Sequence, residues 1–207
     1  MQLFSNSFAD GDRIPEDFAF GIQDAARHIR LGKNLNPHLV WRDVPEGTQS
    51  FALICHDPDV PAQGDDVNQE GRVVPATLPR MEFFHWVLAD LPATLVKIEA
   101  GEFSRGVTPR GKSGPPGPHG SRRGLNDYTN WFAQDHDMRG DYYGYDGPCP
   151  PWNDERLHRY IFTLYALDVE RLPHEGQLTG PALRQAIAGH VLAEASLTGQ
   201  YSLNPAV

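Results

Sequence analysis

The stretch Gly147-Pro148-Cys149-Pro150-Pro151, followed shortly by Leu157-His158-Arg159-Tyr160, is the most informative part of the chain. Three prolines fix φ and remove three backbone donors, so this loop is shaped for something other than sheet pairing. Side chains in the strand that follows alternate between its two faces. One face carries His158, Tyr160, Phe162 and Leu164. It is polar where the strand begins and apolar beyond, which is typical of a pocket at the rim of a core.

The composition excludes several classes of protein. The 207 residues fit one domain, and 40% of them are hydrophobic, which is enough for a sizeable core. The formal charge of −9 argues against a nucleic-acid partner, because such partners are bound through Lys and Arg contacts to phosphates. Net charge does not exclude a local pocket for one small anion.

The cysteines and the hydropathy pattern indicate a cytoplasmic protein without integral membrane association. Cys55 and Cys149 are too few for a disulfide framework and are expected to be free thiols. The N-terminal residues lack the basic and apolar regions of a signal peptide, and no apolar run is long enough to span a membrane.

Short strands separated by turns dominate the pattern. The 18 prolines and 20 glycines break the chain into short pieces, which favours an all-β sandwich or barrel. Strands are predicted at Phe51–His56, Glu82–Leu88 and His158–Leu167, with a shorter one at Leu39–Trp41 and a last one from Ala193. The fold class is therefore mainly β, an antiparallel sandwich with a few short peripheral helices.

Two helices are predicted at the periphery. Pro181 suits a first helical turn, and Leu183, Ile187 and Val191 recur at helical spacing, which predicts a helix near 181–190. A second short helix is predicted at about 22–30. The region 105–146 shows no clear element and is long for a loop, which is typical of functional or disordered segments. Its Gly111-Lys112-Ser113 lacks the spacing and flanking elements of a phosphate-binding loop.

Three predicted strands each carry one or two ionisable side chains. Asp57 continues the face of Phe51, Leu53 and Cys55, so it is either a turn residue or a site residue. His85 shares a face with Phe83 and Val87, where a lone histidine is commonly a satisfied core residue. His158 and Tyr160 begin the third strand, where a simple strand-edge pair is an equal alternative.

Taken together, these residues favour a ligand site. Asp57, His85, His158 and Tyr160 would form a small polar cluster in an apolar cavity. Imidazoles, a phenol and backbone amides can bind a phosphate or a carboxylate through charge-assisted hydrogen bonds. Asp57 would orient one histidine and raise its pKa, keeping that histidine cationic.

The chain resembles the phosphatidylethanolamine-binding proteins, also called Raf kinase inhibitor proteins, and particularly their bacterial branch. The resemblance rests on three motifs in the same order along nearly the whole chain. These are Asp57-Pro58-Asp59-Val60-Pro61, Phe84-His85-Trp86-Val87, and Gly147-Pro148-Cys149-Pro150-Pro151 leading to His158-Arg159-Tyr160. It implies one domain over residues 1–207, built as a large central antiparallel sheet packed on a smaller one.

The resemblance also implies a pocket for an anion, either phosphate or a phosphoethanolamine-like headgroup. Its ligand-binding residues would be Asp57, Asp59, Pro61, His85, Gly147, Pro150, His158 and Tyr160. No catalytic residue, metal or cofactor is implied. Arg159 is expected to form a structural ion pair, and a cis peptide bond is implied at Val60–Pro61.

The chain departs from this branch at two places. An acidic and aromatic insertion occupies about 129–142, and the segment from Pro151 to His158 is longer than the family pattern. Both flank the expected mouth of the pocket.

Three functions compete at this point. The first is a non-catalytic binding protein for a small anionic ligand; regulation of a kinase or hydrolase, a homodimer and an unknown protein partner stay open for it. The second is a hydrolase that uses either a metal bound by His and Asp side chains or Cys149 beside His158. The third is a pure interaction module.

Overall fold

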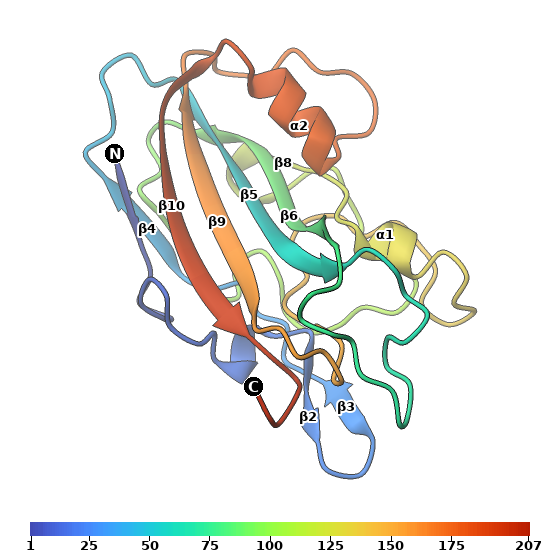
Figure 1. The fold of residues 1–207 in the computed structure, drawn as a ribbon. Coiled ribbons are helices and arrows are strands. Elements are labelled where there is room, and N and C mark those ends of the chain that lie inside the picture. Colours follow the sequence, from blue (N-terminus) through green and yellow to red (C-terminus); the bar gives the residue numbers. More distant parts are fainter.

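The five-stranded sheet at the centre of the molecule confirms the mainly β prediction (Figure 1). The computed structural model describes residues 1–207. Its large sheet has the order β10-β9-β5-β6-β8, and neighbouring strands are antiparallel throughout. The strands are β5 (Ser50–Pro61), β6 (Arg80–Pro92), β8 (Arg122–Arg123), β9 (His158–Leu167) and β10 (Val191–Tyr201). The structure therefore confirms the predicted strands at 51–56, 82–88 and 158–167.

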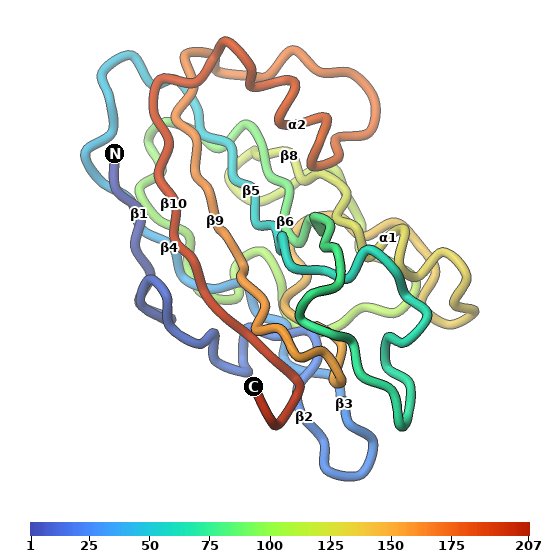
Figure 2. Tube along the Cα trace, viewed as in Figure 1, coloured from blue at the N-terminus to red at the C-terminus, as the bar shows by residue number.

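A smaller sheet covers one face of the large sheet. It has the order β1-β4-β7 and consists of β1 (Gln2–Phe4), β4 (Leu39–Arg42) and β7 (Lys97–Ile98). The tube view shows β1 running beside β4 (Figure 2). A core of 23 buried residues includes Leu39 and Trp41 of the small sheet and Phe162 and Leu164 of β9. The antiparallel sandwich is confirmed.

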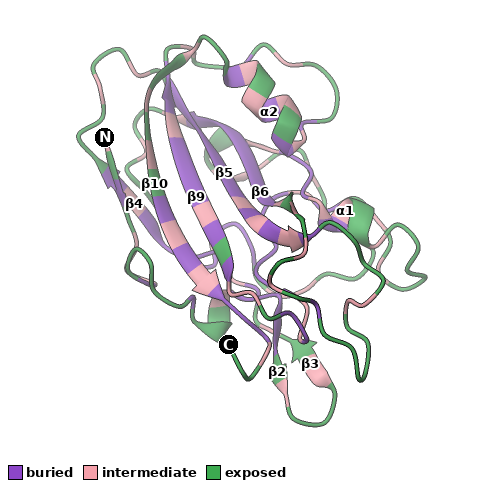
Figure 3. Cartoon of the chain, viewed as in Figure 1, coloured by how far each residue is buried: buried purple, intermediate pink, exposed green.

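Helix α2 (Gly180–Ile187) covers the other face of the large sheet. Thr179 caps it by accepting the Ala182 N–H at 3.4 Å, and Pro181 occupies the first turn. Leu183 and Ile187 pack on a second buried cluster that includes residues of β5 and β6. With both faces covered, the central strands are buried almost throughout (Figure 3). The predicted C-terminal helix is confirmed.

The predicted helix at 22–30 is wrong. These residues form a hairpin of β2 (Gly21–Asp24) and β3 (His28–Leu31). The Asp24 carboxylate accepts the N–H groups of Ala26 and Arg27, both at 2.9 Å, and so stabilises the turn. A local side-chain bond of this kind competes with a helix, which the apolar spacing alone does not reveal.

The implied cis bond at Val60–Pro61 is also wrong. The structure has one cis peptide bond, at Gly114–Pro115. The strand β5 runs on through Pro61, and its last residues pair with Met81 and Arg80 of β6. The pairing register shifts between Asp57 and Val60, so an irregularity in the strand redirects the chain instead.

The region 105–146 is built from short pieces that return to the sheet. It contains the 3₁₀ turn η2 (Pro118–Gly120), strand β8 and the one-turn helix α1 (Tyr128–Trp131), while another 3₁₀ turn, η1 (Glu16–Phe18), lies near the N-terminus. Tyr128 and Tyr142 are buried against Phe20 in a small aromatic cluster. The segment 129–142 thus follows the buried Tyr128 and ends in the buried Tyr142.

We predict that the inter-sheet core dominates stability. Replacing Leu164 by Ala leaves a cavity at a position that is 0% exposed, and should cost about 2–5 kcal/mol of unfolding free energy. Leu192→Ala is the matched control, because Leu192 is 43% exposed and should change stability by about 0.5 kcal/mol or less. Urea unfolding measures both, and equal losses in the two variants would contradict the described core.

Candidate functional site

Four predicted site residues from three neighbouring strands meet at one end of the sandwich. Asp57 lies near the end of β5, His85 on β6, and His158 and Tyr160 on β9. None of the four is more than 3% exposed. Asp57 Oδ2 lies 2.7 Å from His158 Nδ1, and the rings of His85 and Tyr160 are 5.1 Å apart between centroids.

His85 reaches this cluster by a different route from the one that strand alternation predicts. Cys55 pairs with Trp86, yet the next residue of β5, His56, pairs with Phe84, so His85 is the extra residue of a bulge. Phe84 and Val87 consequently pack together on the face covered by α2, while Trp86 packs in the inter-sheet core. The predicted sharing of one face by His85 and Val87 is wrong.

His158 is held by carboxylates at both ring nitrogens. Asp57 accepts from Nδ1 at 2.7 Å, and Asp154 Oδ2 lies 3.0 Å from Nε2. Burial by itself would lower the pKa of the imidazole, but the hydrogen bonds and negative charges of Asp154 and Asp57 raise the pKa of His158 to about 9. His158 is therefore a buried cation at neutral pH, with both N–H groups already in use.

Asp154 is a site residue that sequence reasoning missed. Its carboxylate is paired with the Arg80 guanidinium, and both side chains are almost fully buried. Arg80 also donates to the carbonyl oxygens of Asp59, Leu78 and Pro75, so its position is fixed. The only signal for Asp154 was the unusual length of the segment from Pro151 to His158, in which it lies.

Asp59 belongs to a neighbouring arginine network. Arg159 binds its carboxylate through Nε at 2.8 Å and Nη2 at 3.0 Å, and Arg156 adds a contact at 3.2 Å. Burial would raise the pKa of Asp59, but the two arginines lower it overall. The structural ion pair expected for Arg159 is confirmed. The Asp59 N–H donates to Asp57 Oδ1 at 2.7 Å, which helps to orient Asp57.

His85 has one ring nitrogen bonded and one free. Its Nδ1 lies 2.8 Å from the Asp146 carbonyl oxygen, so Nδ1 carries a proton and donates it. The Asp146 N–H returns a bond to the His85 carbonyl at 3.0 Å. Burial lowers the pKa of His85 below its ordinary value, which favours the neutral ring. Nε2 makes no hydrogen bond within the protein and, in the neutral ring, is an acceptor.

A buried polar network supports His85 through Asp146. The fully buried Asp146 carboxylate accepts from Asn34 at 2.7 Å, from Asn126 at 2.8 Å and from Lys112 at 3.0 Å. Lys112 Nζ also donates to the Tyr145 carbonyl. Lys112, which lies in the glycine-flanked Gly111-Lys112-Ser113 segment, is thus a buried structural cation.

The Gly147–Pro151 loop is anchored from both sides. The Gly147 N–H donates to Asn34 Oδ1 at 2.8 Å, and its carbonyl accepts the Tyr128 hydroxyl, also at 2.8 Å. A Cβ at Gly147 would lie 2.1 Å from the Phe18 carbonyl oxygen, so only glycine fits. The hydrogen bond from Tyr128 thus ties the start of the segment 129–142 to this loop.

Two polar groups at this end of the sandwich, the Tyr160 hydroxyl and the Cys149 N–H, lack a hydrogen-bond partner. The Tyr160 hydroxyl is buried and makes no hydrogen bond of good geometry, although the Asp57 carboxylate lies near it. The Cys149 N–H likewise has no acceptor within the protein. Burial and the nearby Asp57 charge raise the pKa of Tyr160, so its hydroxyl keeps its proton and can donate it. Buried polar groups are rarely left unpaired, so the Tyr160 hydroxyl calls for an explanation such as a bound ligand or water.

The geometry needed for a Cys149–His158 hydrolase is not present. Both cysteines are free, which confirms the expected thiols. Burial raises the pKa of Cys149 to about 12, so it is a neutral thiol at pH 7. Both nitrogens of His158 already face carboxylates, so it cannot take a proton from that thiol. No group of three or more His, Cys, Asp or Glu side chains is arranged to hold a metal ion.

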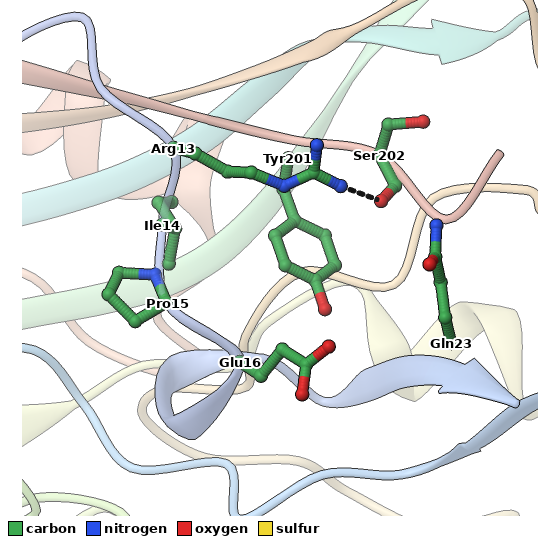
Figure 4. A pocket seen from close by; sticks show the side chains of 7 residues that line it. All are labelled: Arg13, Ile14, Pro15, Glu16, Gln23, Tyr201 and Ser202. Atoms are coloured by element: carbon green, nitrogen blue, oxygen red, sulfur yellow. Dashed lines mark hydrogen bonds between the residues drawn. The ribbon is translucent and has the colours of Figure 1, made fainter. Parts of the chain in front are cut away.

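Two surface hollows are lined by other residues. One, of about 190 Å³, is lined by Arg13, Glu16, Gln23 and Tyr201 among others, with the Arg13 guanidinium bonded to the Ser202 carbonyl (Figure 4). The other, of about 630 Å³, lies beside His28 and Trp152. Neither includes a predicted site residue. No helix is long and apolar enough to cross a membrane.

The sandwich and its polar end define a binding protein of the phosphatidylethanolamine-binding type, and comparisons with known proteins agree. A family model described as phosphatidylethanolamine-binding protein matches residues 4–202. Protein YbhB of Escherichia coli is 32% identical over 202 residues, covering 98% of this chain and 100% of YbhB. A relative from Aquifex aeolicus is 30% identical over 97% of this chain and 88% of its own length. The chain belongs to the phosphatidylethanolamine-binding protein family.

Solved structures share the fold. Escherichia coli YbcL, described as a new member of the mammalian family, matches with a TM-score of 0.68 and 24% identity over 97% of both chains. A putative homologue from Chlamydia trachomatis matches with a TM-score of 0.63 and 28% identity, over 97% of this chain and 96% of that one.

We predict that stability falls between about pH 6.5 and 9. The pKa of His158 is raised from 6.5 to about 9 in the folded state, so its contribution is fully present below pH 6.5 and is lost as the pH rises through 9. The loss should reach up to about 3 kcal/mol, at roughly 1.4 kcal/mol per pKa unit. Urea unfolding at pH 6 and 9 measures it. Asp154→Asn should show a smaller slope; an unchanged slope would contradict the double pairing.

Proposed function

We propose that this chain is a non-catalytic binding protein whose pocket holds one small oxyanion, either phosphate or a phosphoethanolamine-like headgroup. The residues that we propose to form this pocket, by contacting the ligand or by holding those that do, are Asp57, Asp59, Pro61, His85, Gly147, Pro150, His158 and Tyr160. Membership of the family supports a binding role. The observation that supports an anionic ligand is the buried, unpartnered hydroxyl of Tyr160, and the Cys149 N–H of the neighbouring loop is a second free donor.

The two free donors suit an anion physically. An O–H and a backbone N–H directed at an oxyanion make charge-assisted hydrogen bonds, which are stronger than neutral ones. The carboxylates nearby do not prevent this, because Asp57 and Asp154 are balanced by the cations His158 and Arg80. The network is close to neutral overall, so the anion meets donors without a net repulsive charge.

Within this proposal the polar residues have different tasks. Tyr160, His85 and the 147–150 loop would contact the ligand. Asp57 and His158 would hold one another in place beneath it. Asp59 acts through Asp57, whose orientation it helps to fix. Pro61 pairs with Arg80, which holds Asp154. A regulatory role toward a kinase or hydrolase, which the family resemblance implies, would act through occupancy of this pocket.

Tyr160→Phe tests the proposal because it removes only the unpartnered hydroxyl. A hydrogen bond to a charged group contributes about 1.5–3 kcal/mol, so affinity for phosphate or phosphoethanolamine should fall about tenfold or more. Stability without ligand should hardly change, because the lost hydroxyl has no partner in the protein. Calorimetric titration with each ligand separately distinguishes free phosphate from a headgroup.

Tyr145→Phe is the matched control. Tyr145 is also fully buried, but its hydroxyl donates to the Phe18 carbonyl at 2.7 Å. This variant should lose stability and keep its affinity, the opposite of Tyr160→Phe. Unchanged phosphate and phosphoethanolamine binding in Tyr160→Phe, or no binding to the wild type, would overturn the proposed function.

A further inference from the structure

The two histidines of the site offer a ligand only one ring nitrogen. Both nitrogens of His158 face carboxylates, and Nδ1 of His85 donates to the Asp146 carbonyl. What remains is His85 Nε2, together with the Tyr160 hydroxyl and the Cys149 N–H. The resulting set is one acceptor and two donors, whereas an anion site built for a fully ionised ligand would consist of donors alone.

The surroundings of His85 keep Nε2 an acceptor. The rings of Phe83, Tyr160 and Tyr128 pack on it at centroid distances of 4.9, 5.1 and 5.6 Å. The charged groups that act on it are Asp57, Asp146 and His158. Burial and the His158 cation disfavour a second proton, and the Asp57 and Asp146 charges favour one; burial dominates and lowers the pKa of His85. Tyr128 cannot supply a proton to Nε2, because its hydroxyl is committed to the Gly147 carbonyl.

We propose that the pocket selects oxyanions that carry a proton, and that Asp154 sets this selectivity by occupying the Nε2–H of His158. This inference rests on the proposed anion site and specifies its ligand class. A hydrogenphosphate group complements these three groups chemically, since its O–H can donate to His85 Nε2 while its other oxygens accept from Tyr160 and Cys149. Sulfate has no proton at neutral pH. One of its oxygens would face His85 Nε2 with both atoms presenting lone pairs, which is repulsive.

The Asp154 carboxylate takes the hydrogen bond of His158 Nε2–H that an anionic ligand could otherwise accept. Its Oδ2 lies 3.0 Å from His158 Nε2 and its carboxylate is locked by Arg80, in a segment that is longer than the family pattern. With Asp154 in place, His158 has no N–H for a ligand. Without it, that N–H would be free and the site would offer a third donor, which is the arrangement that a dianion without a proton requires.

Calorimetry with sodium phosphate and sodium sulfate at pH 7 and equal ionic strength tests the selectivity. We expect phosphate to bind the wild type at least tenfold more tightly than sulfate. Asp154→Ala should reduce this preference by tightening sulfate binding at least tenfold. Asp168→Ala is the matched control: it removes an aspartate paired with an exposed histidine, His190, at 2.9 Å, and makes the same change in net charge. It should leave both affinities unchanged.

A pH comparison separates a headgroup from free phosphate. A phosphate monoester loses its last proton near pH 6, so phosphoethanolamine should bind more weakly at pH 7.5 than at pH 5.5. Inorganic phosphate keeps a proton at both values and should lose less. Sulfate, which has no proton to lose, controls for protonation of His85: a matching loss with sulfate would assign the effect to His85 and overturn the inference.

The remaining outcomes distinguish a failure of this inference from a failure of the proposed function. If phosphate binds and sulfate binds the wild type equally well, the inference is wrong while the anion site stands. If neither binds, the proposed function fails and the inference with it. Should Asp154→Ala not fold, Asp154→Asn is titrated in the same way, and an unchanged ratio of phosphate to sulfate affinity in that variant overturns the role of Asp154.

Discussion

The buried chain of charges Asp57–His158–Asp154–Arg80 is the interaction on which the polar end of this sandwich depends. It joins β5, β9, the segment before β9 and β6 through contacts that are almost completely removed from water. Removing one partner from a buried pair typically costs about 3–5 kcal/mol, because the other charge is left uncompensated. The four groups must therefore be present together, and they hold this buried polar cluster in one arrangement.

This arrangement separates the two histidines by task. His158 is fixed as a cation by two carboxylates, so it holds Asp57 and Asp154 in place. His85 is kept neutral by burial and held by reciprocal bonds with Asp146, which leaves one nitrogen available. Two histidines that look interchangeable in the sequence thus differ in charge. His158 is a cation because carboxylates face both of its nitrogens, and His85 is neutral because aromatic rings and a backbone carbonyl surround it.

Regular alternation along a strand was enough to predict part of the site. It placed Asp57 on the inner face of β5 and His158 with Tyr160 on β9, as found. It failed for His85, because a bulge is a property of pairing between two strands and leaves little trace in either one. The hairpin at 21–31 was missed for a related reason, since the Asp24 turn overrides the apolar spacing.

Asp154 and Arg80 could not be predicted, because they lie 74 residues apart and meet only after β6 and β9 are placed in one sheet. Imidazole nitrogen NMR of the wild type at pH 7 tests the resulting account most directly. The account predicts a doubly protonated His158, and a neutral His85 with its proton on Nδ1 whose Nε2 signal alone moves when phosphate is added. A neutral His158, or a phosphate response at His158 instead of His85, would contradict it.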